Sequence, residues 1–127
     1  MIEITGTVVH GKHFGRTIKY PTANLDRRSF VRRKQKIRQG VWAGIVVIYK
    51  GLNIKDKEYR AGIVIGPIDK YNLPKIEAHL LGFKGNLYGK KITLHLKKYL
   101  RPFKKFKNID QLKKQISEDI LQIRKLK

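Results

Sequence analysis

The sequence predicts a mainly β fold, a closed barrel or sandwich of short strands that is followed by one C-terminal helix. Two patterns carry this prediction. Over about residues 1–100, short apolar or alternating segments recur at regular spacing between turn residues, as they do in barrels and sandwiches. Over about residues 109–124, apolar residues instead recur at steps of three and four, which is the helical period. At 127 residues and without internal repeats, we expect one domain over residues 1–127.

Each predicted strand has its own signal. Residues 2–10 alternate between apolar and polar side chains, whereas residues 41–49 are apolar on both faces, as in a strand covered on both sides. Residues 75–83 alternate as well, with Ile76, Ala78 and Leu80 on one face and Glu77 and His79 on the other. The predicted strands are residues 2–10, 41–49, 58–66, 75–83 and 91–97, with turns or loops at 50–57, 67–74 and 84–86 between them.

The helix prediction rests on a cap and a stripe. Asn108 can cap the first turn while Gln111 reaches back, as in a capping box. The stripe predicted to be buried against the strands consists of Ile109, Leu112, Ile116, Ile120 and Ile123.

A glycine-hinged basic turn, residues 11–16, is a candidate phosphate cradle. Gly11 and Gly15 allow a close backbone approach to a ligand, and Lys12 and Arg16 add positive charge beside them. The alternative is a solvated basic loop.

Pro21 starts a stiff, extended segment that contains Thr22 and Asn24. Because side chains alternate along extended backbone, these two point the same way and Ala23 points to the other face. A hydroxyl and an amide oxygen side by side suit Mg²⁺ shared with substrate phosphates. The alternative is a plain turn and strand start, in which Thr22 and Asn24 cap local backbone.

Nine carboxylates allow a general base to be sought by elimination. Asp110, Glu118 and Asp119 are assigned to the capping or solvent face of the helix. Glu77 sits mid-strand among apolar neighbours on the face that carries Leu81 and Phe83, a setting that suits a general base. The alternative for Glu77 is an outward glutamate paired with a lysine.

Composition bears on the possible partners, the cellular compartment and the possible metal ligands. Thirty Lys and Arg against nine Asp and Glu give a net charge of +21, with bases concentrated in residues 27–38 and 97–107. This charge either attracts polyanions or is a solvated lysine-rich surface. There is no cysteine and no apolar run long enough to span a bilayer, so we expect a cytoplasmic protein without disulfides. The four histidines show no metal-ligand spacing and are interpreted as structural or surface residues.

An ordered set of motifs over nearly the whole chain resembles the riboflavin kinase family, both the monofunctional enzyme and the C-terminal half of bifunctional bacterial flavin synthetases. The matching segments are residues 6–11, 15–16, 20–25, 40–44, 76–83, 86–90 and 100–102, with Phe106 before the helix.

The resemblance implies a six-stranded Greek-key barrel that transfers the γ-phosphoryl group of ATP to the 5′-hydroxyl of riboflavin and gives FMN. It implies that ATP phosphates lie over residues 11–16, and that Thr22 and Asn24 hold Mg²⁺ or another divalent ion such as Zn²⁺. It makes Glu77 the catalytic residue. Arg101 resembles a family arginine near the flavin, with an exposed salt bridge as its alternative role.

Tyr88 is an aromatic candidate to flank the flavin, and core packing is its alternative. A monomer is expected. We expect that a chain of this length does not hold a second, adenylylating domain, and that Met1 directly before the first strand favours a natural start. Free-standing enzyme and excised domain both remain open.

Three positions depart from the family pattern: Lys19 replaces a glycine, Val64 an asparagine and Phe103 an acidic residue. They leave open a homologue that binds flavin without turnover. A basic barrel that binds nucleic acid is the alternative from another class. For a kinase, we expect only non-specific nucleic-acid binding.

Overall fold

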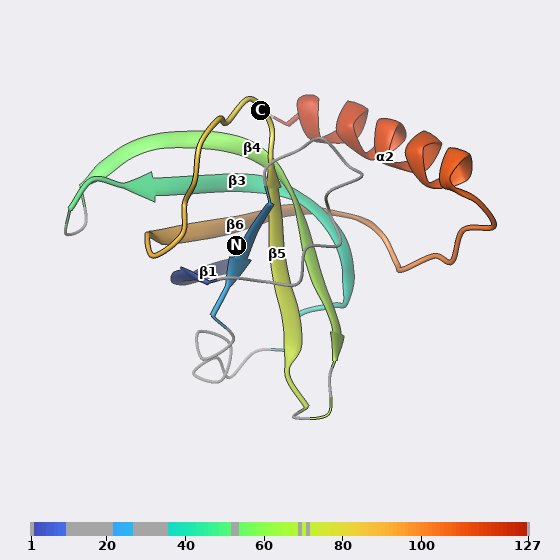
Figure 1. Cartoon of the computed structure of the whole chain (residues 1–127), viewed down its shortest axis with the longest axis horizontal. Coiled ribbons are helices and arrows are strands. Elements are labelled where there is room, and N and C mark those ends of the chain that lie inside the picture. The colour runs from blue at the N-terminus through green and yellow to red at the C-terminus, as the bar shows by residue number, and fades with distance from the viewer. Residues whose placement is uncertain are drawn as a thin grey trace.

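The computed structural model describes residues 2–9, 22–26, 36–51, 54–68, 70 and 72–126. Within them, six antiparallel strands close into a barrel and one helix lies outside it (Figure 1). Neighbouring strands follow the order β1-β2-β5-β4-β3-β6, and β6 pairs with β1. Because β2 returns beside β5, strands β2 to β5 form a Greek key. The predicted barrel with a C-terminal helix is confirmed. The elements are β1 (Ile2–Val9), β2 (Thr22–Leu25), β3 (Gly40–Tyr49), β4 (Lys55–Ile68), β5 (Pro74–Leu80), β6 (Lys91–Arg101) and α2 (Ile109–Arg124).

The core fills the barrel with branched aliphatic side chains from alternate strand positions. Burying one such side chain contributes roughly 2 kcal/mol, so this layer holds the strands around it. On β2 the buried residues are Ala23 and Leu25, so Thr22 and Asn24 share the outer face; that they share a face opposite Ala23 was predicted. The largest fully buried side chains are those of Ile4, Val46, Ile63, Ile65, Ile76, Leu80, Ile92 and Leu94.

Four predicted strand ends were wrong by two residues or more, and among them the strand predicted to end at residue 66 continues to Ile68. The turn predicted at 50–57 is shorter, because Lys55 already pairs with Tyr49 and backbone pairing extends the hairpin through exposed charged residues. The strand predicted to end at residue 97 continues to Arg101, because β3 pairs with it as far as Val41, the partner of Arg101. The strand predicted over 75–83 ends at Leu80, and Gly82, with φ 80°, turns the chain.

This early end of β5 separates two residues that were predicted to share the face of Glu77. The amide of Leu81 donates to the carbonyl of Arg60, and Leu81 stays on the outer surface. Phe83 instead packs against the core, with its ring edge on Tyr59 at 5.3 Å between centroids.

The helix α2 is capped at Asn108, whose Oδ1 accepts from the amide of Gln111 at 2.9 Å. The side chain of Gln111 reaches back to the amide of Lys107, one residue before the position that a capping box uses. Ile109 was predicted to be buried but is 51% exposed, because the helix begins before it reaches the barrel. The helix contacts β3 and β4, where Gly62 leaves room for it.

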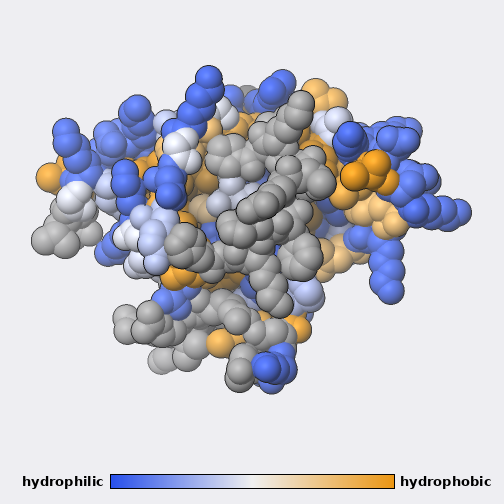
Figure 2. All heavy atoms as spheres, viewed as in Figure 1, coloured by the Kyte–Doolittle hydropathy of each residue, from blue (hydrophilic) through white to orange (hydrophobic). Residues whose placement is uncertain are grey.

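The outer surface is rich in polar side chains, as the charge predicts. Figure 2 shows hydrophilic residues gathered on both flanks of the face that it draws, over the end of the β3–β4 hairpin and around α2. No helix in the described part of the chain is long and apolar enough to cross a bilayer.

Candidate active site

Four predicted or neighbouring polar residues meet on the outer surface where β2 pairs with β5. Asn24 lies directly opposite Glu77, and Thr22 lies directly opposite His79. Facing positions on paired strands have Cβ atoms about 5 Å apart, which is within reach of these side chains. Three residues chosen separately from the sequence are therefore brought together with His79 in one cluster, which we call the polar cluster: Thr22, Asn24, Glu77 and His79.

Glu77 is outward but well covered, with 12% of its side chain exposed. One carboxylate oxygen, Oε2, lies 2.9 Å from Nζ of Lys75, and the other, Oε1, lies 3.4 Å from Nε2 of His79. The lysine partner that was the alternative interpretation of Glu77 is thus present. Pairing and burial together hold the carboxylate in a fixed place beside Asn24.

His79 joins the two halves of the polar cluster. Its Nδ1 lies 3.2 Å from Oγ1 of Thr22, and its Nε2 faces Glu77. Burial lowers the pKa of His79 below its ordinary value of 6.5; Glu77 opposes this shift and Lys75 adds to it. The imidazole is therefore held in its neutral form at neutral pH.

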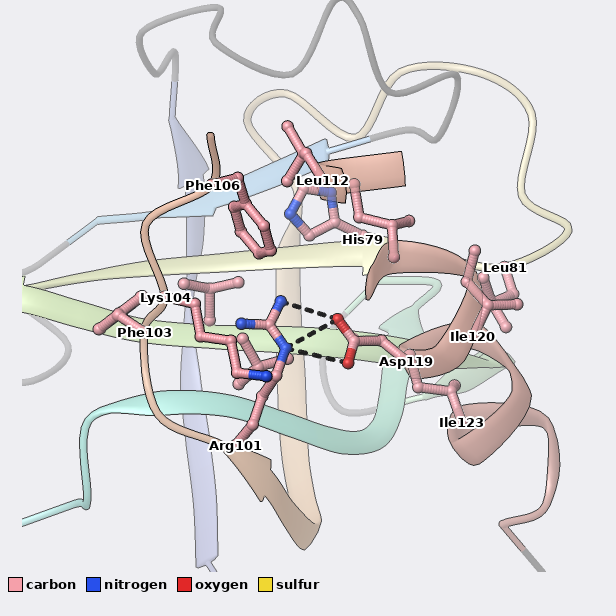
Figure 3. A pocket seen from close by; sticks show the side chains of 14 residues that line it. His79, Leu81, Arg101, Phe103, Lys104, Phe106, Leu112, Asp119, Ile120 and Ile123 are labelled. Atoms are coloured by element: carbon pink, nitrogen blue, oxygen red, sulfur yellow. Dashed lines mark hydrogen bonds and ion pairs between the residues drawn. The ribbon is translucent and has the colours of Figure 1, made fainter. Parts of the chain in front are cut away.

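Beside the polar cluster, an apolar pocket of about 220 Å³ lies between the barrel and α2 (Figure 3). His79 is in its wall, so the pocket adjoins the polar cluster. A concave, mainly apolar pocket with a few polar groups is the usual form of a small-molecule site. Its walls are formed by Val41, Gly62, Val64, His79, Leu81, Arg101, Phe103, Lys104, Phe106, Leu112, Ile116, Asp119, Ile120 and Ile123.

An ion pair between Arg101 and Asp119 ties the end of β6 to α2 at this pocket (Figure 3). The guanidinium donates through Nε to Oδ1 and Oδ2 at 3.0 and 3.1 Å, and through Nη2 to Oδ2 at 2.8 Å. Gln115 donates to Asp119 as well, at 3.1 Å, and accepts from Lys104 at 3.2 Å. This network fixes the helix and the segment after β6 as two walls of the pocket.

The prediction that Asp119 lies on a capping or solvent face was wrong. It is 9% exposed, because its position on α2 follows Ile116 by three residues and precedes Ile123 by four, so it shares their face. His79 was also missed as a site residue. The sequence did contain a signal for His79. It lies two residues after Glu77, so both side chains are on the same face of β5.

The other predicted site residues are placed as follows. Gly11, Lys12, Gly15 and Arg16 lie outside the described residues, as does Lys19. Val64 and Phe103, two departures from the family pattern, both line the pocket.

Arg101 is in the wall of the pocket, but Tyr88 is not. Tyr88 is 52% exposed in a turn that hydrogen-bonds to the end of β1 through the amide of Gly89 and the carbonyl of Val8. Tyr88 thus lies near the end of β1, away from the pocket walls.

Fold and site together define a class of protein: a small closed barrel that carries a small-molecule site on its outer surface. The family model described as Flavokinase, riboflavin kinase, matches residues 1–127. The chain therefore belongs to the riboflavin kinase family.

Curated relatives agree with this assignment. The bifunctional riboflavin kinase/FMN adenylyltransferase of Escherichia coli K12 is 38% identical over 121 residues, which cover 95% of this chain and 36% of that protein. The RNA-binding riboflavin kinase RibR of Bacillus subtilis is 31% identical over 124 residues, covering 94% of this chain and 49% of that one. The chain thus spans about a third to a half of the length of these relatives.

Solved structures share the fold. A Streptococcus pneumoniae structure titled macrolide-efflux protein has a TM-score of 0.81 and 29% identity, covering 98% of this chain and 39% of that one. Riboflavin kinase from Trypanosoma brucei has a TM-score of 0.68 and 20% identity, covering 96% and 74%. At that identity the second likeness concerns the fold alone.

Proposed function

We propose that this chain is a riboflavin kinase, which transfers the γ-phosphoryl group of ATP to the 5′-hydroxyl of riboflavin and gives FMN. The observation that carries the proposal is the direct pairing of Asn24 with Glu77, beside an apolar pocket. Family membership supports the same reaction. All the residues that we assign lie in one chain, and we propose a monomer.

The apolar pocket is proposed to take the flavin ring. Its walls are mostly aliphatic and aromatic, as a planar ring system requires, and Arg101 supplies a cation at its edge. Because His79 belongs to both the pocket wall and the polar cluster, a ring held here would direct its ribityl chain toward Glu77. Tyr88 remains a proposed flavin contact, from outside the pocket walls.

Glu77 is proposed to orient the 5′-hydroxyl and take its proton. The carboxylate is held by Lys75 and lies directly opposite Asn24. It therefore needs little reorganisation to receive a substrate. Phosphoryl transfer has a loose transition state, and positioning accounts for most of what the protein contributes.

A divalent cation fits the oxygens of Thr22 and Asn24. Both side chains project from the outer face of β2. Hydroxyl and amide oxygens are hard ligands that favour Mg²⁺ over Zn²⁺. When bound, the ion would neutralise charge on the phosphates of ATP. We propose that Gly11, Lys12, Gly15 and Arg16 contact those phosphates through backbone amides and basic side chains.

The proposal is tested by separating flavins chromatographically after incubation with riboflavin, ATP and Mg²⁺. Wild-type protein should give FMN, and Thr22→Ala, Asn24→Ala and Glu77→Gln should each reduce the rate by about 10²-fold or more. Glu58→Gln is the matched control, since Glu58 is an exposed glutamate paired with Lys55 on the hairpin. Riboflavin binding without FMN would overturn the kinase assignment in favour of a flavin-binding homologue, with Val64 and Phe103 the first positions to revert.

A second candidate function, nucleic-acid binding, is favoured by a groove with several basic residues at the C-terminal end of α2. Its walls include Arg60 of β4, Lys97 of β6 and Arg124 of α2, with the ring of Tyr59 beside them. A register shift in β6 puts Lys98 opposite Ala43 on the same outer side as Lys97. Cations that follow a groove beside an aromatic ring suit a single strand.

This candidate is tested by fluorescence anisotropy of a labelled single-stranded RNA at several salt concentrations. Arg60→Glu with Arg124→Glu should weaken binding by at least about tenfold more than the control pair Lys55→Glu with Lys57→Glu, because each groove cation is expected to neutralise a phosphate. Equal losses for both pairs would show that only the net charge of +21 matters.

A further inference from the structure

We propose that His79 is a positioning residue, which orients the hydroxyl of Thr22 and the carboxylate of Glu77 at the same time through its two ring nitrogens. This rests on the proposed function, because it assigns a role within the same reaction. His79 is not expected to touch the reacting atoms. Its task is to present the oxygen of Thr22 to the cation and to fix the direction of the Glu77 carboxylate.

His79 contacts two residues that have different proposed roles, Thr22 and Glu77. Its Nδ1 lies 3.2 Å from Oγ1 of Thr22 on β2, and its Nε2 lies 3.4 Å from Oε1 of Glu77 on β5. The backbone enforces this geometry, because His79 is the direct partner of Thr22 and shares a strand face with Glu77. One imidazole therefore links the proposed metal ligand to the proposed base.

The arrangement selects one tautomer of the ring. A carboxylate only accepts hydrogen bonds, so the ring nitrogen that faces Glu77 must carry the hydrogen. Nδ1 is then an acceptor, and the hydroxyl of Thr22 donates to it. A hydroxyl that donates keeps the lone pairs of its oxygen as acceptors, which is what a cation requires.

The opposite tautomer would fail at both ends. Its bare Nε2 would face the Glu77 carboxylate, lone pair against negative charge, and its Nδ1 hydrogen would occupy the oxygen of Thr22. Among the residues that the structure describes, the charged groups around the ring are Glu77 and Lys75 on β5, with Arg101, Lys104 and Asp119 across the pocket.

Two substitutions separate the two contacts. The amide of a glutamine reaches the place of Nε2, so His79→Gln keeps a donor to Glu77 and loses the acceptor for Thr22. The amide of an asparagine reaches the place of Nδ1, so His79→Asn keeps a partner for Thr22 and loses the donor to Glu77. Removing an outer partner of this kind typically costs 10- to 100-fold, or about tenfold at the least.

The expected kinetic results therefore differ in kind. His79→Gln should raise the Mg²⁺ concentration for half-maximal FMN formation about tenfold, with kcat at saturating Mg²⁺ within about threefold of wild type. His79→Asn should lower kcat about tenfold or more at an unchanged Mg²⁺ requirement. His95→Gln is the matched control, because Nδ1 of His95 lies 3.2 Å from Glu3 outside the site. Equal effects of the two His79 variants on both parameters would overturn the proposal.

A second readout does not depend on turnover. Nitrogen-15 NMR of the imidazole rings distinguishes the two neutral tautomers, and the His79 signal is assigned by its absence in His79→Asn. The Nε2–H form with an accepting Nδ1 is expected, and the Nδ1–H form would overturn the proposal. Absence of FMN with wild-type protein would instead count against the kinase function, while the tautomer result would still stand or fall independently.

Discussion

Asn24 and Glu77 face each other across β2 and β5, and the row that they begin continues around the outside of the barrel. Val64 is the next partner of Glu77, and Val41 is the partner of both Val64 and Arg101. A single row of the sheet thus connects the proposed metal ligand, the proposed base and the cation of the pocket. Val64, a departure from the family pattern, lies at its centre.

This adjacency predicts that Asn24 and Glu77 act as a unit. Glu77→Gln should lower kcat about 10²- to 10³-fold, and adding Asn24→Ala should cost less than the product of the two single effects, because each depends on the other's position. The check is a double-mutant cycle on FMN formation. A strictly multiplicative loss, as expected for Glu77→Gln combined with the remote Glu58→Gln, would show that the two residues act independently.

Asp119→Asn should destabilise the protein and loosen the pocket. The substitution removes the charge that receives three hydrogen bonds from Arg101, which is itself largely buried. We expect a loss of about 2 kcal/mol in the free energy of unfolding and a higher KM for riboflavin. Urea unfolding and flavin kinetics measure the two effects. The control is Glu118→Gln, an exposed neighbour on α2, and a loss no larger than its own would contradict the prediction.

Two glycines should respond very differently to alanine. A Cβ at Gly44 would lie 2.2 Å from the carbonyl oxygen of His95 and 2.6 Å from Cδ1 of Ile63, and the backbone carbonyl cannot move aside. A Cβ at Gly62 would lie 3.1 Å from Cδ1 of Ile123, a side-chain end.

Gly44→Ala should therefore cost about 3 kcal/mol or prevent folding, and Gly62→Ala about 1 kcal/mol at most. Thermal unfolding compares the melting temperatures of the two variants. Adding Ile123→Val should relieve the strain of Gly62→Ala and should not relieve that of Gly44→Ala. A similar melting temperature for the two single variants would contradict this reasoning.

Stability should fall on acidification through His79. Its pKa in the folded protein lies below the ordinary value of 6.5, so between these two values only the unfolded chain takes up the proton. The unfolded state is therefore favoured as the pH falls, and the contribution is complete above 6.5. Urea unfolding of metal-free protein from about pH 8 to about pH 5 should show this slope, and His79→Gln should reduce it. Parallel curves for the two proteins would refute the assignment.

The alternation of β2 and β5 could be predicted from the sequence, and with it the shared face of Thr22 and Asn24 and the separation of Glu77 from Ile76 and Ala78. Which strands would pair could not, because register depends on contacts between residues far apart in the chain. The facing of His79 with Thr22 is a product of that register, so a histidine without metal-ligand spacing was interpreted as structural.

The error at Asp119 has a related cause. A carboxylate on a helix is normally solvated. Asp119 can be buried because Arg101, at the end of β6, forms an ion pair with it. The strand ends were misplaced for the same reason. At Lys55 and Arg101, the length of the partner strand β3 overrides the polar composition of the segment.

The seam between β1 and β6 sets the order in which the molecule can form. Residues 2–7 pair with residues 91–96, so the first strand of the barrel cannot complete its pairing until the last one is present. Contacts between such distant segments slow folding, because the chain must lose the entropy of the long loop before the strand pairing lowers the free energy. The hairpin of β3 and β4 can form early, while the row from Asn24 to Arg101 exists only once β6 has joined. Until that moment the growing chain has exposed strand edges and no site, which makes synthesis the stage at which this protein is most open to aggregation.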